Sequence, residues 1–350
     1  MKTMKVVRLL APGNLKMMDM PRPVPGPHQV LCKVKRVGVC GTDYSIYTGE
    51  ASFVKSGAVH FPMTLGHEWS GTVAELGPDV AQFKVGDRVV GDTGVGCGYC
   101  TDCMLGQWPK CTKMQAVGTV FAWDGGYAEY VLMPERHLFH LPDAVSFDNG
   151  ALVEPSATAL YSVKKAQVQI GDTVLVQGSG PIGILAARLA KLSGASKVAI
   201  TGRKDSKLKT AVDMGIDGAI NTQRESLLDG VRRIFGAPKV DRIIEASGST
   251  ELFRESFGLI KSGGALSVVA FYDKPLKEFD IDQFVFSDII MAAVPGSLGM
   301  FPPVLNLMAS GMLDATKIVT ERAPLAKVTE LLPKLKENAD QRIKILLELE

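Results

Sequence analysis

Residues 173–192 read TVLVQGSGPIGILAARLAKL, which is a short apolar run, a glycine-rich turn and a segment of helix length. Gly178, Gly180 and Gly183 give the turn the pattern G-x-G-x-x-G. In that pattern the first glycine permits the tight turn, the second lets the backbone approach a pyrophosphate, and the third allows close helix packing. The helix N-terminus adds the positive end of a dipole. The turn, including Pro181 and Ile182, is therefore predicted to bind a dinucleotide.

The context of the turn supports this prediction. The five residues before it are typical of a buried strand, and the segment after it repeats apolar residues at the spacing of one helix face. The residues expected on that buried face are Ile182, Leu185, Ala186 and Leu189. A lone G-x-G-x-x-G match is weak, whereas one between a strand and a helix is specific.

Strands and helices alternate beyond this stretch. The runs KVAIT at 197–201, VDRIIEAS at 240–247 and ALSVVAF at 265–271 have the βαβ rhythm of a parallel sheet. The first 150 residues instead contain short β-like runs between Gly and Pro, such as VLCKVKRVGV at 30–39, and the last residues, RIKILLELE, read as a strand. We expect an α/β chain with a mostly β domain at 1–155, a doubly wound Rossmann domain at 156–292, and a return to the first domain at 293–350.

Charge and hydropathy narrow the possible partners. The formal net charge of the 350 residues is +2, without long basic runs, so nucleic acid is not expected as a partner. Apolar runs stay short of the roughly 20 residues that span a bilayer, and the start MKTMKVVRLLAPG is too short and charged for a signal peptide. We therefore expect a cytoplasmic protein without membrane association, whose cysteines are thiols or thiolates rather than disulfides.

A cluster of cysteines lies within fifteen residues: Cys97, Cys100, Cys103 and Cys111. The spacing C-x-x-C-x-x-C followed by a fourth cysteine suits one tetrahedral Zn²⁺. An iron–sulfur cluster uses similar spacing, but bacterial ferredoxins place three residues before the last cysteine, whereas seven stand here. Four protein ligands leave zinc no open position, so a zinc ion in this lobe, at about 95–113, is expected to be structural.

A second set of metal-ligand residues is spread along the chain: Cys40 in GVCGTD, His67 and Glu68 in LGHEWSG, and Glu154 in LVEPSATA. Three or four of them with water would make an open zinc site. Taken singly, each could equally be a packed or hydrogen-bonded residue. Cys32, which alternates with valines on one strand face, is expected in the core.

These motifs, in this order, resemble the zinc-containing medium-chain dehydrogenase/reductase family, and within it the polyol, sorbitol and threonine dehydrogenase branch. The resemblance covers nearly the whole chain: GVCGTD, GHEWSGTV, the four-cysteine lobe, DGGYAEYV, VEP and the glycine-rich turn. It implies a GroES-like catalytic domain, a structural zinc, and a catalytic zinc held by Cys40, His67 and Glu154, with Glu68 as an exchanging or second-shell ligand. How Glu68 and Glu154 divide that work stays open.

The resemblance also implies a reaction, in which hydride moves between the carbinol carbon of a small polar alcohol and NAD(P). Thr42 would contact substrate or pass a proton, although a structural turn hydroxyl is the alternative. Many relatives have a relay histidine where this chain has Ser45, so the proton could leave through water, the cofactor ribose or Glu154. Sorbitol-type enzymes have an Arg-Tyr pair where this chain has Gly296-Ser297, which weakens the case for sorbitol itself. Homodimers or homotetramers are usual in the family.

The choice between NAD and NADP depends on the end of the second strand, where NAD-binding domains place an acidic residue. This chain has Gly202 there, followed by Arg203, Lys204 and Lys207. These cations could bind a 2′-phosphate, so NADP(H) is favoured. Alternatively, they are solvated charges, and Asp205 is a helix cap.

Three further expectations concern the pocket and the competing classes. Tyr44, Phe121 and Trp123 are candidate pocket walls, with plain core as the alternative. A zinc-free quinone or enone reductase of the same fold would lack the cysteine lobe and the Cys40/His67 pair. A zinc-lobed protein that binds NADP without oxidising alcohols remains the alternative outside enzymology.

Overall fold

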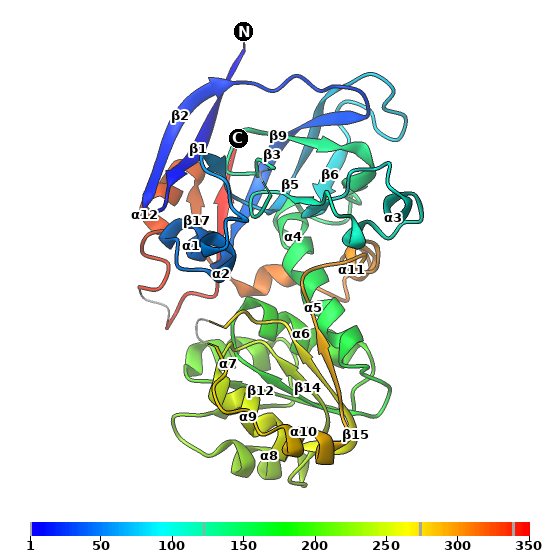
Figure 1. The fold of residues 1–350 in the computed structure, drawn as a ribbon, viewed down its shortest axis with the longest axis vertical. Coiled ribbons are helices and arrows are strands. Elements are labelled where there is room, and N and C mark those ends of the chain that lie inside the picture. Colours follow the sequence, from blue (N-terminus) through cyan, green and yellow to red (C-terminus); the bar gives the residue numbers. More distant parts are fainter. Residues whose placement is uncertain (1, 122, 273–274, 338–339) are drawn as a thin grey trace. The chain divides into compact units, whose positions relative to one another are not determined.

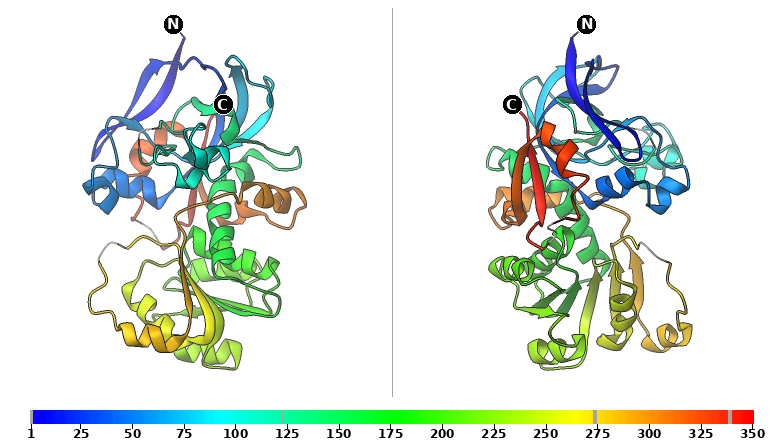
Figure 2. Two further views of the ribbon diagram at one scale, coloured as in Figure 1. Left: turned by 45° about the vertical axis from the view of Figure 1, so that its right-hand side comes forward. Right: turned by 90° about the vertical axis from the view of Figure 1, so that its left-hand side faces the viewer.

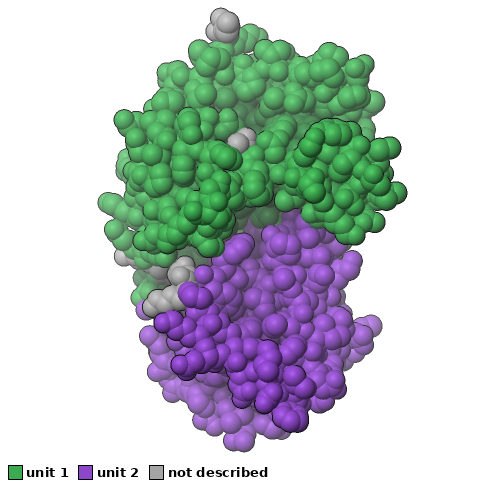
Figure 3. Space-filling view, viewed as in Figure 1, with its two compact units in different colours: residues 1–154, 301–350 green, residues 155–300 purple. Residues whose placement is uncertain are grey.

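The computed structural model describes residues 2–121, 123–272, 275–337 and 340–350. Its contacts divide the chain into two compact units: residues 1–154 with 301–350, and residues 155–300 (Figure 3). The sequence placed the second boundary at 292/293, and the contacts place it at Met300/Phe301.

The second unit is built around the glycine-rich turn. It contains β11 Thr173–Gln177, α6 Pro181–Leu192, β12 Lys197–Gly202, α7 Asp205–Asp213, β13 Gly218–Asn221, α8 Leu227–Phe235, β14 Val240–Glu245, α9 Thr250–Leu259, β15 Ile260–Val268, α10 Ile281–Ser287 and β16 Ile290–Ala293 (Figure 1). All five strand pairings are parallel, in the order β13-β12-β11-β14-β15-β16. This is the 3-2-1-4-5-6 order of doubly wound dinucleotide folds, with the order reversing between β11 and β14.

Helix α6 follows the predicted face only in part. Leu185, Ala186 and Leu189 are fully buried against β11 and β12, as expected. Ile182 is only half-buried, because the first turn of the helix packs less deeply than the middle. Ile184 and Ala187 are fully buried as well, so α6 buries a wider stripe than the sequence pattern suggested.

The first unit is mostly β. Its strands are β1 Thr3–Ala11, β2 Asn14–Pro21, β3 Gln29–Val39, β4 Met63–Thr64, β5 Glu68–Leu76, β6 Arg88–Gly91, β7 Gly94–Val95, β8 Gln115–Ala116, β9 Tyr130–Pro134, β10 Leu138–His140, β17 Val319–Pro324 and β18 Lys344–Glu348. Its helices include α1 Gly41–Thr48, α2 Ser52–Lys55, α3 Thr101–Met104, α4 Phe147–Ala151, α11 Phe301–Ala309 and α12 Val328–Leu331, and α5 Val153–Lys165 crosses the unit boundary. The central sheet runs β10-β6-β5-β3-β18-β17, with β9 also paired to β3. Cys32 on β3 is fully buried in its core, as predicted.

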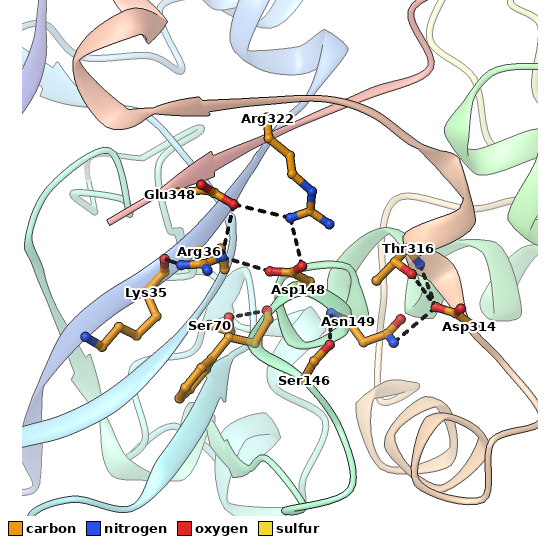
Figure 4. A network of polar contacts seen from close by, with 11 residues as sticks. Lys35, Arg36, Ser70, Ser146, Asp148, Asn149, Asp314, Thr316, Arg322 and Glu348 are labelled. Carbon is orange, nitrogen blue, oxygen red and sulfur yellow. Dashed lines mark hydrogen bonds and ion pairs between the residues drawn. The ribbon is translucent and has the colours of Figure 1, made fainter. Parts of the chain in front are cut away.

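The C-terminal strands complete this sheet. Strand β18 pairs antiparallel with β3 and parallel with β17. In Figure 2 the red strand β18 lies beside the orange-red strand β17. A polar network ties the same region to α4: Asp148 accepts from Arg36 at 2.8 Å and pairs with Arg322 at 2.7 Å (Figure 4). Glu348 of β18 lies 3.4 Å from the same Arg322 group. The sheet therefore brings residues near the end of the chain beside those near its start.

Candidate active site and metal centres

The four cysteines of the lobe converge. The Sγ atoms of Cys97, Cys100, Cys103 and Cys111 lie within 4.8 Å of one another, and all six cysteines of the chain are free. The backbone N–H of Tyr99 is the main influence that lowers the pKa of Cys97, to about 6, against the opposing effect of burial. Four converging sulfurs fit a tetrahedral zinc ion, which binds thiolates.

A second group of possible metal ligands converges where β3 ends and the neighbouring β5 begins, in the interior of the central sheet. Cys40 is the N-cap residue of α1, His67 immediately precedes β5, and Glu68 is the first residue of that strand. The potential ligand atoms of these three residues lie within 4.8 Å of one another. His67 and Glu68 are buried, whereas Cys40 is half-exposed. The sulfur, nitrogen and carboxylate donors form a mixed set of the kind found in catalytic zinc sites.

Asp43 supports this group, and the sequence analysis gave it no role. It is fully buried, its Oδ2 accepts the N–H of Cys40 at 2.9 Å and the hydroxyl of Tyr127 at 2.8 Å, and its Oδ1 lies 3.5 Å from Nδ1 of His67. Burial lowers the pKa of His67, but the nearby Asp43 and Cys40 outweigh that effect and raise it. A carboxylate on Nδ1 fixes the orientation of a ligand histidine and leaves Nε2 for the metal.

Lys344 is the other supporting residue that the sequence analysis missed. Its Nζ, only 2% exposed on β18, donates to Oε1 and Oε2 of Glu68 at 2.8 and 2.7 Å and to the carbonyl of Val39 at 3.1 Å. Burial lowers the pKa of Lys344, but the attraction of Glu68 and Cys40 outweighs that effect and raises it overall. Both oxygens of Glu68 are therefore engaged by a buried cation.

Glu154, the fourth candidate, lies at the start of α5. The metal-compatible group among the described residues comprises Cys40, His67 and Glu68, and does not include Glu154. The Glu154 carboxylate is 9% exposed and accepts from Thr93 Oγ1 at 3.3 Å. Burial raises its pKa, while His67 acts in the opposite direction. Glu154 is thus near the group and electrostatically coupled to it.

The remaining candidates in the first unit are more scattered. Thr42 is half-exposed in the first turn of α1, two residues from Cys40. Tyr44 packs on the core, with Lys336 Nζ 5.1 Å from its ring centroid, and Phe121 is 42% exposed with a φ of 61°. Trp123 lines a cavity beside the cysteine lobe, together with Cys97. Its interpretation as a wall of the substrate pocket therefore gains no support.

The glycine-rich turn has the geometry that its pattern requires. Gly178 has a φ of 104°, and a Cβ there would lie 2.8 Å from the backbone of Ala246 and Ser247, at the end of the neighbouring β14. A Cβ on Gly183 would lie 1.9 Å from the carbonyl oxygen of Gly178. Gly180 is the N-cap of α6 and Pro181 its first residue, so the free N–H groups of the helix begin directly after the turn.

The end of β12 has no room for an acidic side chain in this conformation. A Cβ on Gly202 would lie 2.3 Å from Oγ of Ser179. The nearest acid, Asp205, accepts a hydrogen bond from Asn221 at 2.7 Å and forms an ion pair with Arg224. Arg203 is exposed, and Lys207 is half-buried in the first turn of α7.

Comparisons with known proteins agree with both units. Residues 26–143 match the alcohol dehydrogenase GroES-like domain, and residues 181–310 match the zinc-binding dehydrogenase family. The chain is 34% identical to sorbitol dehydrogenase of Halalkalibacterium halodurans, over 96% of each protein. It is 33% identical to L-threonine 3-dehydrogenase of a Marinomonas species, over 92% of each.

Solved structures are similar over the full length. A zinc-binding dehydrogenase from Sinorhizobium meliloti bound to NADP has a TM-score of 0.92 at 29% identity, covering 100% of both chains. An alcohol dehydrogenase from E. coli complexed with NADH has a TM-score of 0.90 at 27% identity, covering 99% of both. A GroES-like domain with zinc-compatible donors and a Rossmann domain for NAD or NADP define the zinc-dependent alcohol and polyol dehydrogenases.

The chain belongs to the zinc-containing medium-chain dehydrogenase/reductase family, in its polyol and threonine dehydrogenase branch. The predicted fold class, enzyme class and cofactors, zinc with NAD or NADP, are thereby confirmed. Within the described ranges, no helix combines the length and apolar character needed to cross a bilayer.

Proposed function

We propose that the enzyme oxidises a secondary alcohol, or reduces the corresponding ketone, in a sugar alcohol, cyclitol, sugar phosphate or hydroxy amino acid. The observation that carries the proposal is the convergence of Cys40 and His67 beside two buried carboxylates, Glu68 and Glu154, in a group separate from the cysteine lobe. A lobe of four thiolates leaves no coordination position for a substrate, whereas the mixed set does.

The two candidate groups divide the metal binding. Cys97, Cys100, Cys103 and Cys111 would hold a structural zinc, and Cys40 and His67 would be the fixed ligands of a catalytic one. Glu154 is our choice for the third ligand, because Lys344 engages both oxygens of Glu68. Glu68 would remain in the second shell, with exchange requiring it to leave Lys344. A zinc ion in this site would lower the pKa of a substrate hydroxyl and favour loss of hydride from its carbon to the nicotinamide.

The protein's own groups orient and move protons. Asp43 Oδ1, 3.5 Å from Nδ1 of His67, would orient the imidazole and leave Nε2 as the ligand atom. Thr42, half-exposed and two residues after Cys40 in the sequence, would accept the hydroxyl proton of the substrate and pass it outward. Ser45 stands where a relay histidine would, so we assign the later transfer to water or the cofactor ribose.

We propose NADP(H) as the preferred cofactor. A carboxylate at position 202 would be crowded by Ser179, and the nearest acid, Asp205, is paired with Arg224. Arg203 and Lys207 would then bind the 2′-phosphate, and the backbone of Gly178, Gly180, Pro181, Ile182 and Gly183 would bind the pyrophosphate. A catalytic efficiency with NAD⁺ equal to or above that with NADP⁺ would contradict this preference.

A cytoplasmic homodimer or homotetramer is the assembly we propose. Exposed apolar side chains on α10 and on the edge strand β16 support self-association: Ile281, Val285, Phe286, Ile290 and Met291. An unpaired, apolar sheet edge is rarely left to solvent. Sedimentation velocity would contradict the proposal if the protein stayed monomeric at micromolar concentration.

The test of the reaction is a steady-state screen of polyols, inositols, sugar phosphates and hydroxy amino acids with both NADP⁺ and NAD⁺. We expect turnover with at least one secondary alcohol in the panel, and none with the Cys40→Ser variant. A chain that binds two zinc ions yet oxidises none of these alcohols would favour the non-enzymatic NADP-binding alternative.

A further inference from the structure

The cysteine lobe faces a cavity whose charges the proposed reaction does not use. The cavity measures about 490 Å³, lies within the first unit, and has Cys97 in its wall. Arg136, Lys113 and His28 also line it, whereas the described lining residues include no carboxylate. The carboxylate of Glu135, which precedes Arg136 in the sequence, already has two partners. Its Oε1 lies 3.0 Å from Nδ1 of His28, and its Oε2 accepts the N–H of Ala81 at 3.0 Å.

The formal charge of the zinc-loaded lobe indicates a role for these cations. Four thiolates around Zn²⁺ carry a formal charge of −2, and the segment 95–113 adds one acidic and two basic residues, Asp102, Lys110 and Lys113. With zinc bound, the segment is therefore left at −1. Arg136, which comes from outside the segment, brings the total to zero. Of the four cysteines only Cys111 is buried, and a negative centre at such a partly exposed position is stabilised by cations and hydrogen-bond donors fixed close to it.

Arg136 is anchored where this compensation is needed. Its Nη2 donates to the carbonyl of Gly96, the residue before the first zinc ligand, while the N–H of Gly96 donates to Nε2 of His137 at 3.1 Å. Gly98, between two ligands, has a φ of 87°, and a Cβ there would lie 2.8 Å from Cζ of Arg136. The absence of a side chain at 98 lets the guanidinium lie directly against the lobe backbone.

Lys113 is fixed by a different residue of the lobe. Its Nζ donates to the hydroxyl of Tyr99 at 3.1 Å and lies 5.3 Å from the centre of that ring, and Tyr99 stands between Cys97 and Cys100. Lys113 is close enough to Cys97 and Cys111 to interact with both electrostatically. Lys110, in contrast, donates to Gln107 at 2.7 Å and is not among the described residues that line the cavity.

From this arrangement we infer that Arg136 and Lys113 are positioning residues of the lobe, which compensate the charge of the zinc–tetrathiolate centre and slow the loss of its metal. The physical reason is that the zinc–tetrathiolate centre carries a formal charge of −2, which cations fixed beside the lobe backbone stabilise in the metal-bound state. This inference rests on the proposed assignment of zinc to the four cysteines.

The experiment measures zinc release in the Cys40→Ser background, where the lobe is expected to hold the remaining zinc. Release to 4-(2-pyridylazo)resorcinol is followed at chelator concentrations that no longer affect the rate, so that charge on the chelator has no influence. Loss of an outer-shell partner of a metal site typically weakens it by about 10–100-fold. We therefore expect Arg136→Gln and Lys113→Gln each to accelerate release by about tenfold.

Two matched variants separate compensation from general effects. Arg136→Lys keeps the charge and should release zinc at a rate within about threefold of the parent rate. Lys110→Gln removes an equal charge outside the cavity, and its release rate should stay within the same limit. The inference is overturned if Arg136→Lys is as fast as Arg136→Gln, if Lys110→Gln is as fast as Lys113→Gln, or if Arg136→Gln and Lys113→Gln match the parent. A Cys40→Ser chain that binds no zinc would instead refute the metal assignment itself.

Discussion

The two metal-compatible groups of the first unit are built in opposite ways. The cysteine lobe takes all its donors from fifteen consecutive residues, with four like donor atoms. The Cys40/His67/Glu68 group draws on a helix cap and the start of a strand, and its supporting cation, Lys344, lies 276 residues from Glu68. A local set of identical donors suits a closed structural site, whereas a distributed, mixed set depends on the fold and leaves a position open for chemistry.

The largest expected effect is loss of activity in Cys40→Ser. Because metal ions supply several kcal/mol of transition-state stabilisation, kcat/KM should fall by at least about 10³-fold while the chain stays folded. Cys97→Ser is the matched control: it should mainly lower thermal stability and retain turnover at low temperature. Steady-state rates and circular dichroism on both variants check this, and equal activity of Cys40→Ser and the parent would refute the assignment.

Next in size is the stability loss in Lys344→Met. Removing one partner of a buried ion pair leaves Glu68 uncompensated, which should cost about 3–5 kcal/mol. Adding Glu68→Gln should restore part of that loss. All three tryptophans, Trp69, Trp108 and Trp123, lie in the first unit, so tryptophan fluorescence during urea unfolding reports on that unit. Equal losses in the single and double variants would show that Lys344 does not act through Glu68.

A smaller effect is expected from Asp43→Asn. The amide keeps the size of the side chain but loses the charge that faces Nδ1 of His67, so metal affinity and kcat/KM should each fall by about 10–100-fold. In Tyr127→Phe, which removes only the hydroxyl that donates to Asp43, metal affinity and kcat/KM should fall by less. Zinc content and kinetics measured on the same preparations test the order, and a larger loss in Tyr127→Phe would contradict it.

The smallest expected effect is on the pH dependence of unfolding stability, through His137 beside the lobe. Burial, helped by Arg136, lowers the pKa of His137 to about 4, so this side chain is neutral in the folded state. Because an unfolded histidine titrates near 6.5, its contribution to stability is complete above about pH 6.5 and is lost as the pH falls toward 4. His137→Gln should flatten the fall in urea stability over that range, and His140→Gln, whose ring is exposed, should not. Identical slopes for the parent and His137→Gln would refute this.

Sequence patterns predicted what depends on local spacing. The apolar run before Gly178 predicted the strand, the periodicity after it predicted the helix, and the cysteine spacing predicted the lobe. The half-buried position of Ile182 was missed, because periodicity does not tell how deeply the first turn of a helix packs. The Cys40/His67/Glu68 group came from the family resemblance, since each residue alone has an ordinary structural explanation.

Long-range partners could not be read from the sequence. Asp43 was visible in GVCGTD, but an acid three residues after a helix cap ordinarily caps the helix, and here its second oxygen also faces His67. Lys344 reaches Glu68 only because β18 pairs with β3, and that pairing has no local signature. For the same reason, Arg136 could not be linked to the lobe before the fold was known.

The most direct test of two metals with separate tasks is to follow zinc content and turnover together while a chelator strips the wild-type enzyme. We predict two zinc ions per chain that leave in distinct phases. All activity should be lost with one ion, and thermal stability should fall with the other. A single zinc per chain, or activity that declines in proportion to both ions, would contradict it.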